Sequence, residues 1–277
     1  MKNRPYTVKA INNYAHYFYT DTALSYEKEM VAYAKMAKEF LNKPFDHPSG
    51  IVGNYEWHEE FPYEKYLFFD LDTEKPLVDF PNAVALDFGC GVGRMVNRAR
   101  KLFSKVDGVD VSEYALDYAK KTYPGSDFFI STGMDVGGVP ADTYDLVYST
   151  IAIQHIPCRT IRENIFWGLH NALKPGGIFS IQMAYHPTIK AGVWSHDSEH
   201  ASYDSDFWNA KATNGHADVV INHDDLRKVH RDISFIFDNV TMGLVNVSNI
   251  YGNLNGKHHS AYWAEDWLFI QGRKWKS

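Results

Sequence analysis

The 277-residue sequence has little cysteine and no long hydrophobic run. Its two cysteines, Cys90 and Cys158, are too few for a disulfide framework, and they do not form the Cys-x-x-Cys pair that is typical of structural zinc. No stretch approaches the ~18 apolar residues of a membrane span, and the N-terminus lacks the apolar core of a signal peptide. These absences predict a protein of the cytoplasm that does not enter a membrane.

The sequence also lacks runs of lysine and arginine. Its net charge is −6, and basic residues number 28 against 34 acidic ones. The electrostatic footprint of a nucleic-acid-binding protein is therefore missing, and we expect no nucleic-acid partner. Aromatic residues make up 15% of the chain, which is compatible with both a packed core and a walled ligand pocket. The sequence makes no prediction of the oligomeric state.

The first part of the chain has a different pattern from the rest. Apolar residues at helical spacing predict an amphipathic helix over residues 25–41, and a short helix is expected over 64–71. An irregular segment rich in aromatic residues lies between them. We expect residues 1–80 to form a cap or lid on a main domain that covers residues 81–277.

From residue 83 onward, short β-rich runs alternate with helical stretches, which is typical of an α/β protein with a parallel sheet. We expect strands at residues 83–88, 106–111, 127–130, 145–149 and 177–183. We expect helices at residues 94–103, 113–122, with Ser112 as its N-cap, and 160–173. Residues 186–222 show little periodicity and are interpreted as an irregular insertion. A helix at 223–230 and a hairpin of strands at 234–245 and 267–273 complete the prediction.

One segment, residues 84–93, carries most of the functional information. An apolar strand runs into Asp87 and then into three glycines at alternate positions, Gly89, Gly91 and Gly93, just before a helix. Glycines allow the backbone to turn tightly and to approach a ligand closely. A dinucleotide fingerprint needs a third glycine where this chain has Arg94 or Val96. Asp87 would also repel a pyrophosphate, whereas it suits a cationic amino-acid ligand.

A second acidic residue, Asp110, ends the next predicted strand. A carboxylate at this strand end can accept hydrogen bonds from both ribose hydroxyls. The chain here resembles the class I S-adenosylmethionine-dependent methyltransferases over residues 80–185. Four blocks carry the resemblance, at residues 86–93, 108–112, 144–149 and 173–177. It implies a Rossmann-like fold with a mostly parallel seven-stranded sheet and an antiparallel C-terminal hairpin strand.

The resemblance implies S-adenosylmethionine as the cofactor, S-adenosylhomocysteine as the product, and a set of residues around them. The glycine loop lies under the methionine portion, Asp110 holds the ribose, and the residues after the third strand flank the adenine. Asp135 is a looser transfer, because many relatives have an acid where this chain has Gly133. The predicted cofactor-binding residues are Asp87, Gly89, Cys90, Gly91, Gly93, Asp110, Val111, Met134, Asp135 and Ser149.

Methyl transfer from a sulfonium is an in-line displacement that requires positioning and, for a hydroxyl or protonated amine, a base. His155 and His186, after the fourth and fifth strands, are the candidate bases, although a packing or capping role remains open for each. Gln154, Tyr185, Tyr55 and Trp57 are candidate residues for acceptor binding. For the aromatic pair, an alternative role is to pack the cap on the core.

No metal site is predicted. His196 and His200 have the spacing of two ligands on a helix, but a solvated polar loop is the favoured interpretation. His258 and His259 are interpreted as exposed loop residues, with the alternative that their hairpin loop reaches the acceptor over the strand ends. The expected partner is a small polar metabolite methylated at oxygen or nitrogen. The alternatives are a methyltransferase for protein or nucleic acid, a non-catalytic protein that binds the adenosyl ligand, and an NAD-dependent oxidoreductase.

Overall fold

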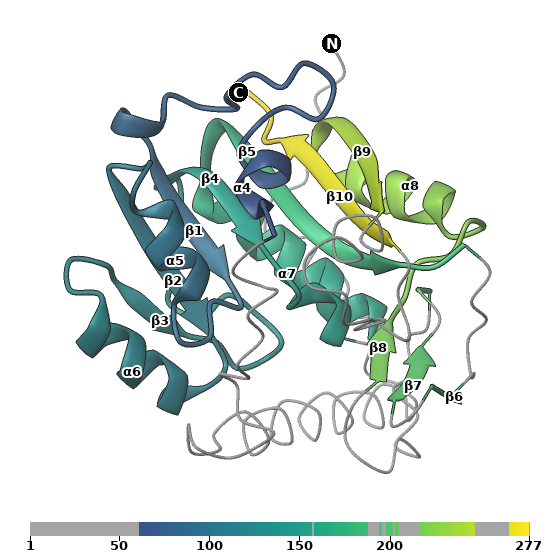
Figure 1. The fold of residues 1–277 in the computed structure, drawn as a ribbon, viewed down its shortest axis with the longest axis horizontal. Coiled ribbons are helices and arrows are strands. Elements are labelled where there is room, and N and C mark those ends of the chain that lie inside the picture. The colour runs from purple at the N-terminus through teal and green to yellow at the C-terminus, as the bar shows by residue number, and fades with distance from the viewer. Residues whose placement is uncertain are drawn as a thin grey trace, which may run out of the picture.

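The computed structural model describes residues 61–156, 158–187, 194–195, 198–201, 203–204, 217–246 and 266–276. The predicted helix over residues 25–41 and most of the predicted cap, including Tyr55 and Trp57, lie outside these ranges. Within them the chain forms an α/β structure, in which a twisted sheet is covered by helices on both faces (Figure 1).

The main sheet has seven strands in the order β3-β2-β1-β4-β5-β10-β9. Strands β1 to β5 pair in parallel, whereas β10 is antiparallel to both β5 and β9. This arrangement confirms the predicted sheet and its antiparallel C-terminal hairpin. The strands are β1 (Val84–Phe88), β2 (Lys105–Asp110), β3 (Phe128–Ile130), β4 (Tyr144–Ser149), β5 (Leu173–Tyr185), β9 (Asp238–Asn246) and β10 (Asp266–Arg273).

Two apolar clusters fix the helices on the two faces of this sheet. One cluster joins the sheet to α4 (Tyr63–Leu67), α5 (Arg94–Ala99) and α6 (Glu113–Thr122). The other joins the opposite face to α7 (Arg159–Ala172) and α8 (Leu226–Ile236). Two short 3-10 helices, η1 (Phe80–Asn82) and η2 (Ile153–His155), precede β1 and follow β4. The result is a three-layer structure with its core on both sides of the sheet.

Most of the predicted boundaries hold, and α6 begins as expected. The hydroxyl oxygen of Ser112 accepts a hydrogen bond from the backbone N–H of Ala115 at 3.1 Å, which confirms Ser112 as the N-cap. The predicted helix over 94–103 was too long, because α5 ends at Ala99. The short helix expected over 64–71 occupies only α4, and Asp70 begins a turn in which its carboxylate accepts N–H bonds from Asp72 and Thr73.

In residues 223–245, the predicted boundary between the helix and the following strand was wrong. The expected helix over 223–230 continues to Ile236, and the strand expected from residue 234 begins at Asp238. Alternating apolar residues at 233–237 resemble a strand, but Val229, Ile233 and Ile236 lie at helical spacing and are all buried against the sheet. Burial of this helical stripe outweighed the local alternation.

The insertion after β5 is more ordered than the sequence indicates. It contains β6 (Trp194–Ser195), β7 (Ser198–Ala201) and β8 (Ala217–Val219), which form a second small sheet in that order. Beyond β8, the backbone N–H of Ile221 donates to Ala184 and its carbonyl accepts from the N–H of His186, both at 2.9 Å. The insertion therefore returns to the end of β5 and pairs with it.

In the part of the chain that the structure describes, no helix is long and apolar enough to cross a membrane.

One buried histidine makes the stability of the fold depend on pH. His170 on α7 is 7% exposed and lies among the rings of Trp167, Phe237 and Trp275. Burial in these surroundings disfavours the imidazolium, and the nearby Lys274 repels it, so the pKa of His170 is lowered to about 4. The neutral ring is the form that the fold accommodates.

We predict that His170 makes the protein lose stability as the pH falls from about 6.5 toward 4, because the unfolded chain binds the proton first. The loss from this residue is expected to reach about 3 kcal/mol below pH 4. The test is the free energy of unfolding by urea at pH 7 and at pH 4 for the unmodified protein, His170→Phe, and the exposed control His230→Gln. An equal loss in the unmodified protein and His170→Phe would contradict the assignment.

Candidate functional site

The site lies where the chain order of the sheet reverses. Strand β1 pairs with β2 on one side and β4 on the other, and the chain leads from β1 toward β2 but from β4 toward β5, in the opposite direction (Figure 1). In an open parallel sheet, this carboxyl edge is the usual place for a ligand. The structure brings most of the sequence-predicted residues to this edge.

The glycine loop after β1 has an unusual backbone conformation. Gly89, Gly91 and Gly93 have φ angles of +74°, +52° and +85°, which favour glycine. The N–H groups of Gly89 and Cys90 both donate to the carbonyl of Val109, at 2.8 and 3.1 Å. These bonds draw the loop onto the end of β2 and leave its far side as bare backbone.

Asp110 ties this loop to the end of β2. One carboxylate oxygen accepts the N–H of Gly91 and the other accepts the N–H of Ser112, both at 2.8 Å. Burial raises the pKa of Asp110, and the N–H donors of Ser112 and Gly91 oppose that rise. Each oxygen keeps a second lone-pair direction, so the carboxylate can still accept bonds from a ligand's hydroxyl groups.

Asp87 carries the least satisfied polar group of the site. The residue is 1% exposed, and neither carboxylate oxygen has a hydrogen-bond partner within the described residues. Burial raises its pKa well above the usual value, Asp110 adds to the rise, and the positive charge of Arg94 opposes it. A buried carboxylate without a partner is costly, and a cationic group is what would relieve it. This chemistry fits the ammonium group of an amino-acid ligand.

The other predicted cofactor residues have mixed placements. The Sγ of Cys90 points at β2, because a β-carbon added to Gly108 would lie 2.6 Å from it. The hydroxyl of Ser149 donates to the carbonyl of Phe88 at 2.8 Å and thereby joins β4 to β1. Both side chains shape the site from within the core.

Residues after β2 and β3 form the outer part of the edge. Val111 and Met134 are half-buried, and Met134 packs on the core beneath α7. Asp135 is exposed, and one of its carboxylate oxygens accepts the N–H groups of Thr132 at 3.1 Å and Gly137 at 2.9 Å. Asp135 therefore shapes this turn, and its second oxygen has no bond to these amides.

The loop after β4 contains a strained residue. Ile151 has a φ of +56°, which is costly for a β-branched side chain. Its N–H donates to the Oε1 of Gln182 on β5 at 2.8 Å, and the Nε2 of Gln182 donates to the Oε1 of Gln154 at 3.3 Å. The sequence analysis did not single out Gln182, although a glutamine inside an apolar strand is itself a signal.

The predicted acceptor-side residues lie around η2 and the end of β5. Gln154 is fully buried and Tyr185 is 4% exposed, so both side chains belong to the interior. His155 is exposed and His186 is half-buried. Because η2 packs against both β5 and β8, the structure gathers these residues beside the insertion.

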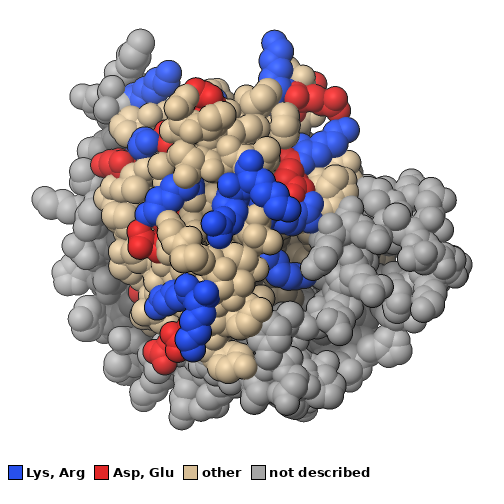
Figure 2. All heavy atoms as spheres, turned by 60° about the vertical axis from the view of Figure 1, so that its left-hand side comes forward, with Lys and Arg blue, Asp and Glu red and all other residues tan. Residues whose placement is uncertain are grey.

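A pocket of about 320 Å³ opens between α4, α5 and the loop after β4. Arg94 and Arg98 line it from α5, Lys101 lines it just beyond the end of that helix, and Thr150 and Ile151 line it from the loop after β4. Figure 2 shows lysine and arginine side chains gathered on this side of the molecule, with acidic side chains among them.

The cations of this pocket differ in how they are paired. Arg98 forms an ion pair with Glu64 and donates to the carbonyl of Phe61 at 3.0 Å. Within the described residues, Arg94 has no such carboxylate, and its charge acts on Asp87. The sequence analysis treated Arg94 only as a missing glycine and so overlooked it as a binding residue, although a cation at the first helical position after a glycine loop was visible.

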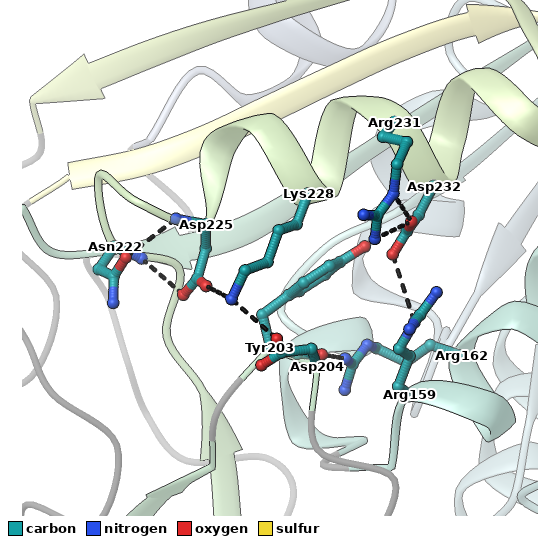
Figure 3. A network of polar contacts seen from close by, with 9 residues as sticks. All are labelled: Arg159, Arg162, Tyr203, Asp204, Asn222, Asp225, Lys228, Arg231 and Asp232. Atoms are coloured by element: carbon teal, nitrogen blue, oxygen red, sulfur yellow. Dashed lines mark hydrogen bonds and ion pairs between the residues drawn. The ribbon is translucent and has the colours of Figure 1, made fainter.

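The insertion is held to this edge by a polar network (Figure 3). The guanidinium of Arg162, 1% exposed, donates to the carbonyl of Ile156 at 2.6 Å and to that of Tyr203, whose ring it also covers. Lys228 on α8 pairs with Asp204 at 2.8 Å. Arg162 therefore joins the loop after β4 to the insertion.

A second part of the network joins α7 to α8 (Figure 3). The carboxylate of Asp232 forms ion pairs with the guanidinium groups of Arg231 at 2.8 Å and Arg159 at 3.3 Å. Asp225, at the start of α8, pairs with Lys228 at 3.2 Å. These contacts give the insertion a fixed base on two core helices.

Several predicted residues lie outside the described part of the chain. Tyr55, Trp57, His196, His258 and His259 are among them. Among the residues that the structure does describe, no group of three or more histidine, cysteine, aspartate or glutamate residues is arranged to hold a metal ion.

The glycine loop generates a mutational prediction. A β-carbon at Gly89 would lie 2.2 Å from the Cβ of Ala152, whereas one at Gly125, also at positive φ, would meet nothing within 4 Å. We expect Gly125→Ala to lower the free energy of unfolding by about 1–2 kcal/mol. Gly89→Ala is expected to cost about 1–3 kcal/mol more, because overpacking is added to backbone strain. Urea unfolding measures both, and equal effects would mean that the loop does not approach Ala152 this closely.

Comparison with known proteins finds similarity to methyltransferases. Residues 86–181 match the model of a family described as a methyltransferase domain. An uncharacterized methyltransferase of Synechocystis is 29% identical over 108 residues, which are 39% of this chain and 50% of that protein. A trans-aconitate 2-methyltransferase of Rhodopseudomonas palustris is 30% identical over 130 residues, 43% of this chain and 48% of that protein. The chain thus spans about half the length of these curated relatives.

A solved structure extends the likeness to the fold. The S-adenosylmethionine-dependent methyltransferase of Mesorhizobium loti superposes with a TM-score of 0.50 at 19% identity, over 71% of this chain and 93% of that one. The strand order, the glycine loop and the family match agree with one another. Over residues 86–181 this chain is similar to the class I S-adenosylmethionine-dependent methyltransferases, and its sheet has the fold of the solved one.

Proposed function

We propose that this protein binds S-adenosylmethionine at the carboxyl edge of β1, β2 and β4 and transfers its methyl group to an oxygen or nitrogen of a small polar metabolite. The observation that carries the proposal is Asp87, a buried carboxylate without a described partner beside a loop of bare backbone. Such a group suits a ligand that brings a positive charge. S-adenosylmethionine brings an ammonium group and a sulfonium, and the sulfonium makes its methyl group electrophilic.

The surrounding residues suit the remaining parts of that molecule. Asp110 is proposed to accept hydrogen bonds from two ribose hydroxyls, and Arg94, which has no ion pair within the described residues, is proposed to bind a carboxylate. Val111, Met134 and Asp135 are the residues proposed to contact the adenine. Gly89, Gly91 and Gly93 are proposed to lie beside the ligand in a conformation that favours glycine, with Cys90 in the same loop. Ser149 bonds to the carbonyl of Phe88, directly before that loop.

The same residues argue against a dinucleotide. A pyrophosphate over the glycine loop would place negative charge beside Asp87. In this chain the position of the third glycine is taken by Arg94 or Val96. The site therefore favours a zwitterionic nucleoside over NAD.

On the acceptor side, we propose His155 as the base and His186 as its alternative, with Gln154 and Tyr185 shaping the pocket. Methyl transfer needs the acceptor atom in line with the leaving sulfur, and a base is needed only to remove a proton from a hydroxyl or ammonium group. His155 lies at the exposed end of η2, where the insertion packs. An exposed imidazole can exchange its proton with solvent between turnovers.

A compact acceptor is supported by the insertion and by one relative. The Arg162 network fixes the insertion beside η2, which favours a bounded acceptor site. A matched relative is named for methylation of trans-aconitate, a small molecule. We further propose a cytoplasmic location, because the chain has only two cysteines, which are too few for a disulfide framework.

The donor assignment is tested by calorimetric titration with S-adenosylhomocysteine. We expect binding to the unmodified protein and an affinity about 10- to 100-fold weaker in Asp110→Ala, because the ribose loses a charged acceptor. Asp142→Ala, which removes a carboxylate paired with Lys274 away from the site, is the control and should bind as the unmodified protein does. Binding of NADH together with no binding of S-adenosylhomocysteine would overturn the assignment.

The acceptor class is tested by transfer of a radiolabelled methyl group to a cell extract that has been separated by size. We expect label in the small-molecule fraction, and a rate at least about tenfold lower for His155→Ala, the effect of losing a general base. His223→Ala replaces another exposed histidine and should keep the rate. Label in protein or nucleic acid would support the alternative acceptors, and no label in any fraction would favour a non-catalytic binding protein.

A further inference from the structure

A row of four polar side chains crosses the sheet on the face covered by α4 and α5. Asp87 on β1 is paired in register with Tyr148 on β4, Tyr148 with Ser180 on β5, and Ser180 with Gln271 on β10. All four residues are buried. In-register residues on neighbouring strands point to the same face of the sheet, so these four side chains lie side by side in one line across the strands.

The two ends of this row differ in their hydrogen bonding. The Nε2 of Gln271 donates to the carbonyls of Tyr66 at 3.1 Å and Phe69 at 2.8 Å, so that end is satisfied by the segment around α4. The carboxylate of Asp87 and the hydroxyls of Tyr148 and Ser180 have no partner in the described part of the chain. The unsatisfied end is therefore the one at β1, beside the glycine loop.

Tyr148 is held rigidly in this position. The residue has no exposed surface, and the edge of the Phe68 ring packs on it with ring centroids 5.1 Å apart. Burial raises the pKa of Tyr148 well above its usual value, and the negative charges of Asp87 and, more weakly, Glu64 raise it further. The phenol thus stays protonated, and the carboxylates of Asp87 on β1 and Glu64 on α4 both act on it electrostatically.

Tyr148 lies near the end of β4, two residues before the first residue of the following loop that lines the pocket. Thr150 and Ile151, directly beyond the end of β4, line the pocket on the sheet side, and Glu64 lines it from α4. Leaving a hydroxyl buried without a partner costs about 1–3 kcal/mol, and phenylalanine would fill the same space without that cost. A ligand group that enters from the pocket would remove the cost.

We propose that the Tyr148 hydroxyl is a second ligand, together with Asp87, for the primary ammonium group of the methyl donor. The inference rests on the proposed function. An ammonium group has three N–H donors, of which Asp87 can accept two and the phenol oxygen one. Tyr148 thereby distinguishes a ligand with an intact amino-acid portion from one without it.

The experiment is calorimetric titration of the full chain and its variants with two ligands. S-adenosylhomocysteine carries the ammonium group, and 5′-methylthioadenosine lacks the whole amino-acid portion. We expect Tyr148→Phe to bind S-adenosylhomocysteine roughly tenfold more weakly and 5′-methylthioadenosine unchanged, which is the effect of one charge-assisted hydrogen bond. The unchanged second ligand shows that the variant is folded.

Ser180→Ala is the matched control, because it removes another unpartnered hydroxyl from the same row, one strand farther from Asp87. It is expected to bind both ligands as the unmodified protein does. Unchanged binding of S-adenosylhomocysteine by Tyr148→Phe, or equally weakened binding of both ligands, would overturn the role of Tyr148 and leave the proposed function standing. Failure of the unmodified protein to bind either ligand would overturn the proposed function and this inference with it.

Discussion

The site depends on one interaction, in which the carboxylate of Asp110 bonds to the N–H groups of Gly91 and Ser112. It joins the loop after β1 to the turn after β2. Two N–H groups of the same loop also donate to the carbonyl of Val109, so part of the loop's hydrogen-bonding capacity is used within the protein. The recognition of a ligand then falls to side chains, above all to Asp87 and to the remaining lone pairs of Asp110. This distribution suits a ligand with a cation and ribose hydroxyls better than one with two phosphates.

The second feature of the site is its uneven hydrogen bonding. Elsewhere, described buried polar groups such as Gln271, Gln182 and Arg162 bond to backbone groups and so hold loops in place. Asp87 and Tyr148 do not. Proteins rarely leave buried polar groups without partners, and for Asp87 and Tyr148, which lie next to the glycine loop, the proposed ligand would supply them. The polar groups that stabilise the fold and those available to a ligand thus lie on neighbouring strands of one sheet.

Much of this fold could be predicted because local pattern and tertiary packing agree. The strands β2 and β4 end in an acidic or hydroxyl residue, and β1 has an acidic residue one position before its end. Ser112 is a capping residue at the start of a helical pattern. Prediction failed at 234–236, where alternation suggests a strand but burial against the sheet requires a helix. It also missed the small sheet of the insertion, whose strands of two to four residues are too short for a periodic signal.

The candidate site divides in the same way. Asp87, Asp110 and the glycines could be found because their chemistry is local to one loop. Gln182, Arg162 and Tyr148 could not, because their importance comes from contacts with residues distant in the sequence: Ile151, Tyr203 and Asp87. The central claim is that the glycine loop and its two carboxylates hold a cationic nucleoside. A crystal structure of the protein soaked with S-adenosylhomocysteine tests it most directly. The account predicts density with the ligand's ammonium group against Asp87 and its ribose against Asp110. An empty edge, or a ligand bound elsewhere, would contradict it.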